Sequence, residues 1–60
     1  MREIKYTYID LYYNKEDQSK ADKRQKDLEK LGYVLEARDL GGGEYSYCDQ
    51  YHRYNKRRTP

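Results

Sequence analysis

The pattern of apolar and polar positions divides the chain into three strand-like segments and one helix-like segment. Residues 4–13, IKYTYIDLYY, are rich in tyrosine, isoleucine and threonine and contain no glycine or proline, which is typical of a β-strand. Apolar side chains occupy both alternating faces of this segment. We therefore expect one strand here that is either covered on both sides or bulged.

A polar segment, from about residue 15 to residue 31, consists almost entirely of good helix formers. Its apolar stripe is narrow, because only Ala21, Leu28 and Leu31 lie close together at about 100° per residue. Gly32 follows directly, at the position where helices commonly end on a left-handed residue. The segment predicts one helix, of which only the second half packs firmly.

Residues 33–40 return to a two-residue alternation and are followed by three glycines at positions 41–43. Glycine accepts the positive φ angles that tight hairpin turns require. The alternation resumes over residues 44–55, so the two segments predict a β-hairpin. In its second strand, alternation places Tyr45, Tyr47 and Tyr51 on one face and Cys48, His52 and Tyr54 on the other.

These elements together predict an α+β fold. We expect a single βαββ domain over residues 1–55, followed by a basic C-terminal tail at residues 56–60. The sheet is expected to be three-stranded and antiparallel in the order 1-3-2, with the helix packed on one face as the crossover connection. The other face of the sheet would stay open, and tyrosines not needed in the core would lie there.

Tyrosine dominates the composition of this short chain. Nine of the 60 residues are tyrosine, and phenylalanine and tryptophan are absent. Only eight aliphatic side chains are large enough to anchor a core, and a chain of this length buries roughly 60% of the surface that it exposes when unfolded. Some tyrosines must therefore complete the core, and the others are available for contact with a partner.

Cysteine content and hydropathy bear on the location of the protein. Cys48 is the only cysteine, so no disulfide can form within the chain, which fits a reducing compartment. The sequence contains no apolar run as long as a signal peptide or a membrane span requires. We expect a cytoplasmic protein with no membrane contact, and its size and composition suggest a mobile-element origin.

The residue types that support catalysis are present but poorly spaced. Cys48 and His52 are four residues apart in a predicted strand, which separates them by about 13 Å, so they cannot share a metal or act as a nucleophile and base pair. The three glycines lack the lysine, hydroxyl and following helix of a phosphate-binding loop. We expect no enzyme activity, no metal and no cofactor.

Rings and cations come together near the end of the chain. Residues 52–60 carry a charge of +4, although the formal net charge of the whole chain is only +2. Alternating cations and aromatic rings are typical of surfaces that bind nucleic acid. The predicted binding residues are Tyr45, Tyr47, Tyr51, His52, Arg53, Tyr54, Lys56, Arg57 and Arg58.

Two functions fit these features. The first is a small nucleic-acid-binding module that uses the tyrosine-rich sheet face and the basic segment, with a homodimer as a way to double the charged surface. The second is an inhibitor or adaptor of the kind that phages and plasmids encode, which would bind a larger host protein such as a CRISPR or restriction component. The small net charge argues against a mimic of DNA.

Overall fold

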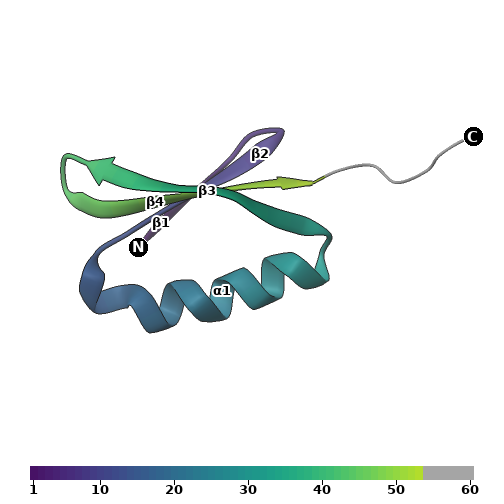
Figure 1. Ribbon diagram of the computed structural model, residues 1–60, viewed down its shortest axis with the longest axis horizontal. Helices are drawn as coiled ribbons and strands as arrows, with labels where there is room; N and C mark the ends of the chain where they lie inside the picture. Colours follow the sequence, from purple (N-terminus) through teal and green to yellow (C-terminus); the bar gives the residue numbers. More distant parts are fainter. Residues whose placement is uncertain (54–60) are drawn as a thin grey trace, which may run out of the picture.

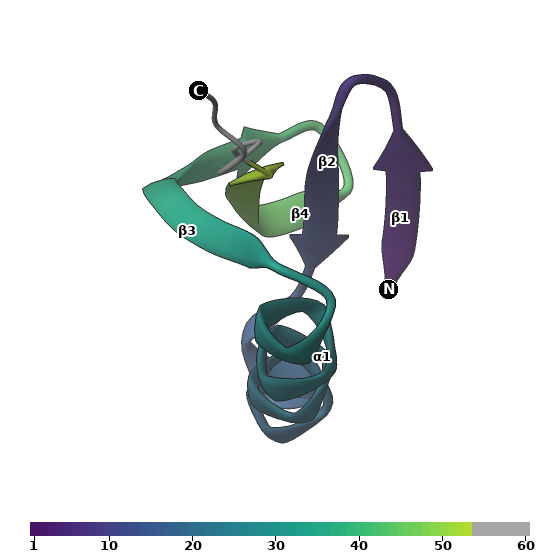
Figure 2. The ribbon, with the colours of Figure 1, turned by 90° about the vertical axis from the view of Figure 1, so that its right-hand side faces the viewer.

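The chain forms one helix and one antiparallel sheet. The computed structural model describes residues 1–53. The sheet has four strands: β1 (Arg2–Lys5), β2 (Tyr8–Tyr13), β3 (Tyr33–Gly42) and β4 (Tyr45–Arg53). Between β2 and β3 the chain forms a 3-10 turn, η1 (Lys15–Asp17), and a helix, α1 (Gln18–Lys30). The strands lie in the order β1-β2-β4-β3. Figures 1 and 2 show α1 on one side of this sheet, with no other described element on the opposite side.

The α+β class with one helix and an antiparallel sheet is confirmed, but the prediction of three strands is wrong. The segment predicted as one strand folds back on itself at Tyr6 and Thr7, so that β1 pairs with β2. The Tyr6 amide donates to the carbonyl of Tyr8 at 2.6 Å and helps to close the turn. This turn contains no glycine or proline, and the sequence therefore gave no signal of it.

The predicted central position of the last strand is confirmed. β4 lies between β2 and β3, with Ile9 opposite Tyr51 and Leu11 opposite Asp49. Burial alternates strictly along β2, because its odd-numbered residues face α1 and its even-numbered residues face away. The apolar core comprises Ile9, Leu11, Tyr13, Ala21, Leu28, Tyr33 and Tyr51. Three of its seven members are tyrosines, so this residue type does complete the core.

Helix α1 packs on the sheet through few residues. Ala21 and Leu28 are its buried residues, whereas Leu31, expected in the same stripe, is 55% exposed because it lies at the end of the helix. Gly32 has a φ of +97°, which confirms the predicted left-handed end. A bidentate pair adds to this packing: Arg24 donates to Glu3 on β1 at 2.7 and 3.0 Å.

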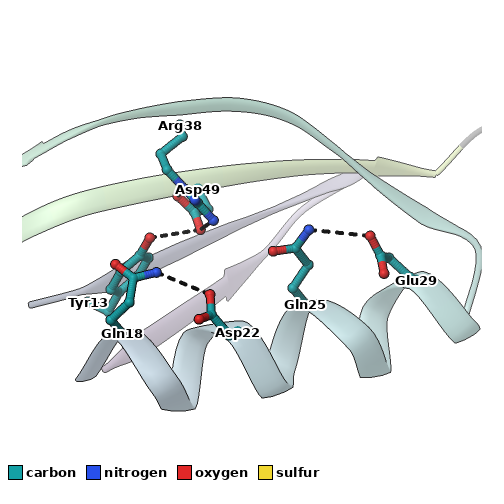
Figure 3. A network of polar contacts seen from close by, with 7 residues as sticks. All are labelled: Tyr13, Gln18, Asp22, Gln25, Glu29, Arg38 and Asp49. Atoms are coloured by element: carbon teal, nitrogen blue, oxygen red, sulfur yellow. Dashed lines mark hydrogen bonds and ion pairs between the residues drawn. The ribbon is translucent and has the colours of Figure 1, made fainter. Parts of the chain in front are cut away.

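A buried polar cluster lies between the sheet and the helix. Asp49 on β4 is fully buried, and its carboxylate accepts bonds from the Arg38 guanidinium at 2.9 and 3.0 Å and from the Tyr13 hydroxyl at 3.0 Å. Figure 3 shows Arg38, Asp49 and Tyr13 directed toward one another from three strands. Because a buried carboxylate is costly unless it is paired, these bonds are needed for Asp49 to lie in the core.

The predicted glycine hairpin joins β3 to β4. Gly42 and Gly43 have φ angles of +74° and +59°, which suit glycine. Gly41 is constrained differently, because a Cβ atom there would lie 2.6 Å from the carbonyl oxygen of Tyr45. β4 pairs with β3 as far as Tyr45, beyond the last pair of β2, so the hairpin extends past the end of β2.

Candidate nucleic-acid interface

The open face of the sheet carries a mixture of rings and polar side chains. The even-numbered residues of β2 and β4 point away from α1, and they pair directly across the two strands. The pairs are Tyr8 with His52, Asp10 with Gln50 and Tyr12 with Cys48. All six side chains are half-buried, which reflects contact with their neighbours on this face.

Three aromatic rings gather at one end of the open face, and we call Tyr6, Tyr8 and His52 the ring cluster. The rings of Tyr8 and His52 are stacked, with centroids 5.5 Å apart and an interplanar angle of 19°. Tyr6 lies beside Tyr8 at 4.9 Å and is 55% exposed. The cluster therefore ends in a ring that is open to solvent and can stack on a further planar group.

Hydrogen bonds fix the orientation of the His52 ring. The Gln50 amide nitrogen donates to Asp10 at 3.2 Å, so the amide oxygen of Gln50 faces His52, with His52 Nε2 at 3.0 Å. An amide oxygen can only accept, which means that Nε2 carries a proton and donates. The ring cluster is thus held in place before any partner arrives.

Two cations adjoin the ring cluster in the sequence but lie on the other face of the sheet. Lys5 immediately precedes Tyr6 and Arg53 immediately follows His52, and both side chains are exposed. Their cross-strand partners, Ile9 for Lys5 and Tyr33 for Arg53, belong to the core, so both cations point toward the α1 side. The Arg53 guanidinium lies 5.8 Å from the centroid of the Tyr33 ring, a cation–π contact. Figure 1 shows the β1–β2 turn and the end of β4 on the same side of the molecule, so the rings lie where the basic segment of the sequence begins.

A hollow marks the other end of the open face. It lies between β1 and the β3–β4 turn, has a volume of about 320 Å³, and includes the rings of Tyr12 and Tyr45, whose centroids are 5.8 Å apart.

The adjacent Cys48 raises the pKa of the Tyr12 hydroxyl, and burial raises the pKa of the Cys48 thiol. Both groups are therefore protonated at neutral pH, and Cys48 is not an activated nucleophile.

The structure separates the predicted site residues into distinct groups. Tyr51 is fully buried under α1 and presents no surface, and Tyr47 packs against the core with its ring 5.4 Å from that of Tyr13. Tyr45 is half-buried beside the hollow. His52 belongs to the ring cluster, whereas Arg53 follows it in β4 and places its guanidinium over the Tyr33 ring on the other face of the sheet. The remaining four, Tyr54, Lys56, Arg57 and Arg58, lie outside the described residues.

Sequence reasoning missed the contribution of the first hairpin. Tyr6, Tyr8 and Tyr12 supply rings to the open face, but none of them was predicted as a binding residue. Their even numbering was a usable signal, since Ile9, Leu11 and Tyr13 at odd positions form the core side of β2. Because residues 4–13 were predicted as a single strand with no turn at Tyr6, the alternation within β2 was not recognised.

Other kinds of site are not indicated by residues 1–53. Within this range no three or more histidine, cysteine, aspartate or glutamate side chains come together as metal ligands would. None of the helices found there has the length and apolar character needed to cross a membrane. Comparison with protein-family models, curated proteins and solved structures finds no match to this chain.

Proposed function

We propose that this protein is a non-enzymatic module that binds single-stranded nucleic acid. Unpaired bases stack on the ring cluster, and the cations of the basic segment that begins at Arg53 contact the phosphates. The observation that supports this best is the stacked Tyr8 and His52 pair, with exposed Tyr6 beside it, at the end of β4 from which the basic segment follows. Single-strand binders combine aromatic rings that stack on bases with cations that contact the backbone.

The energetics favour stacking as the main contribution. Stacking of a base on an aromatic side chain contributes about 1–3 kcal/mol, so two or three bases on the cluster give useful affinity. The formal net charge of +2 is small, and phosphate contacts alone would bind weakly at physiological salt. The hydrogen bonds from His52 through Gln50 to Asp10 reduce the ordering cost, because the ring is already oriented.

An unpaired strand fits this surface better than a duplex. The faces of the bases are accessible only where they are not stacked within a helix. The open face is an antiparallel sheet with the polar pair of Asp10 and Gln50 at its centre, and none of its described elements projects as a helix would into a major groove. A duplex could therefore use the cations but not the rings.

The test compares ring substitutions that keep or remove stacking. Tyr8→Leu should weaken binding of a labelled single-stranded oligonucleotide at least about fivefold, because one stacking contact is lost. Tyr8→Phe keeps the ring and should bind like the wild type. Equal affinities for the Leu and Phe variants, each shown to be folded by circular dichroism, would exclude stacking on this cluster.

A second test addresses the cations. Replacing Arg53, Lys56, Arg57 and Arg58 by glutamine should flatten the salt dependence, because each phosphate contact on a single strand contributes about −0.7 to the slope of log K against log salt. Four contacts would account for a slope of about −3. The matched control replaces four exposed lysines of α1, on the opposite side of the sheet, and should leave the slope nearly unchanged: Lys20, Lys23, Lys26 and Lys30.

A protein partner is the second candidate function. β3 is an edge strand, and it carries two exposed apolar side chains, Leu40 at 83% and Val34 at 49%. Unpaired edges with apolar side chains can accept a strand from another protein. An inhibitor or adaptor of a larger host protein would use this edge, and its complex would tolerate salt and survive the glutamine replacements described above.

A further inference from the structure

The hollow at the other end of the open face has a composition that suits one kind of ligand. It is lined by aromatic, aliphatic, glycine and charged residues, namely Arg2, Ile4, Tyr12, Gly42, Gly43, Glu44 and Tyr45. Its volume of about 320 Å³ falls at the small end of the range for small-molecule sites, which is about 300–1,000 Å³. A single nucleotide is of the right size for it.

The apolar part of the hollow favours a flat ring. Tyr12 and Tyr45 are inclined at 46° to each other, so they are not stacked face to face and each can contact a third ring. Ile4 adds an aliphatic surface. Gly42 and Gly43 leave open space where a side chain would start, because no atom lies within 4 Å of a Cβ built on either.

Two charged side chains that line the hollow indicate which kind of ligand ring would fit. Glu44 supplies a carboxylate, which only accepts hydrogen bonds, and Arg2 supplies a guanidinium, which only donates. Both side chains are exposed, and neither forms an ion pair within residues 1–53. A ligand that enters the hollow can therefore place a pair of N–H donors on Glu44 and an anionic group on Arg2.

We propose that this hollow is a guanine subsite for the nucleic-acid strand. Guanine offers two adjacent donors, the ring N1–H and the exocyclic amino group, which match the two oxygens of the Glu44 carboxylate. In uracil and thymine the single ring N–H lies between two carbonyl oxygens, and in adenine and cytosine the amino group adjoins a ring acceptor. Each of these other bases would place an acceptor against the carboxylate, whereas guanine alone satisfies both oxygens.

Arg2 would contact the phosphate of the bound guanine nucleotide. The subsite rests on the proposed function, because it lies on the same open face as the ring cluster. Tyr12 and Tyr8 are four residues apart in β2, or about 13 Å, so one strand can cross both.

The test uses two labelled single-stranded DNA decamers, one of thymidine only and one with a single central deoxyguanosine. The wild type should bind the guanine-containing decamer at least about fivefold more tightly, as expected for one bidentate contact to a base. Glu44→Gln should abolish that preference, so that the variant binds both decamers with the same affinity. Glu16→Gln, which makes the same charge change at an exposed residue of η1, should retain the preference.

The outcomes separate this inference from the proposed function. Equal binding of both decamers by the wild type, or a preference that survives Glu44→Gln, would overturn the guanine subsite and leave single-strand binding intact. No binding of either decamer at low salt would overturn both. Because Glu44 is exposed, its replacement does not threaten the fold, and circular dichroism of each variant verifies this.

Discussion

Two buried tyrosines should respond in opposite directions to the same substitution. Tyr13 and Tyr51 are both fully buried in the core, and replacement by phenylalanine removes only a hydroxyl group from each. The Tyr13 hydroxyl donates to the buried Asp49 carboxylate at 3.0 Å. The Tyr51 hydroxyl is buried with no hydrogen-bond partner among the described residues. We expect Tyr13→Phe to destabilise the protein and Tyr51→Phe to stabilise it.

The magnitudes follow from these partners. A hydrogen bond to a charged group contributes about 1.5–3 kcal/mol, and Asp49 keeps its two bonds from Arg38, so Tyr13→Phe should cost about 1.5–2 kcal/mol. A buried hydroxyl without a partner costs about 1–3 kcal/mol, and Tyr51→Phe should recover about 1 kcal/mol of this. A domain of 60 residues is stable by only about 3–9 kcal/mol, so both changes are large enough to measure.

Urea unfolding followed by circular dichroism gives the free energy of unfolding of each variant. The two variants should differ by about 2.5–3 kcal/mol, with the wild type between them. A change of the same sign in both, or a difference below about 0.5 kcal/mol, would refute the assignment of one hydroxyl as paired and the other as unpaired.

Three further predictions concern the core and the hairpin. Arg38→Met should cost about 3 kcal/mol, at the low end for a broken buried pair because the Arg38 side chain is 43% exposed, and adding Asp49→Asn should restore part of this in urea unfolding. Gly41→Ala should cost about 1–3 kcal/mol in the same assay, since its Cβ would meet backbone oxygens at 2.6 and 2.9 Å. Burial raises the pKa of both Tyr13 and Tyr51 above the unfolded value of about 10, so their contribution to stability is complete below about pH 10 and is lost as pH rises through the raised values. Tyrosinate absorbance and circular dichroism should therefore change together in alkaline titration, and tyrosinate formation by both buried rings while the fold persists would contradict this.

Much of the fold could be predicted from local pattern. The helix, its glycine end and the glycine hairpin each depend on residues with strong conformational preferences, such as Gly32 at a φ of +97°. The division of residues 4–13 into two strands could not be predicted, because Tyr6 and Thr7 are good strand formers and carry no turn preference, although they form the turn that lets β1 pair with β2. Tertiary contact decided this turn, not local propensity.

The candidate site was predicted less well, for a related reason. Tyr47 and Tyr51 carry the same side chain as Tyr6 and Tyr8, and composition cannot distinguish a core ring from a surface ring. The distinction depends on which face α1 covers, and Asp49 between Tyr47 and Tyr51 made that face look polar. Its partners, Arg38 and Tyr13, come from other strands and could not be paired with it from spacing alone.

The most direct test of the proposed function measures fluorescence anisotropy of labelled single-stranded and duplex oligonucleotides of equal length at several salt concentrations. We expect micromolar or tighter binding of the single strand, weaker binding of the duplex, and a residual single-strand affinity at high salt that Tyr8→Leu lowers at least about fivefold. Absence of single-strand binding at low salt, or equal affinity for strand and duplex with no effect of Tyr8→Leu, would contradict it.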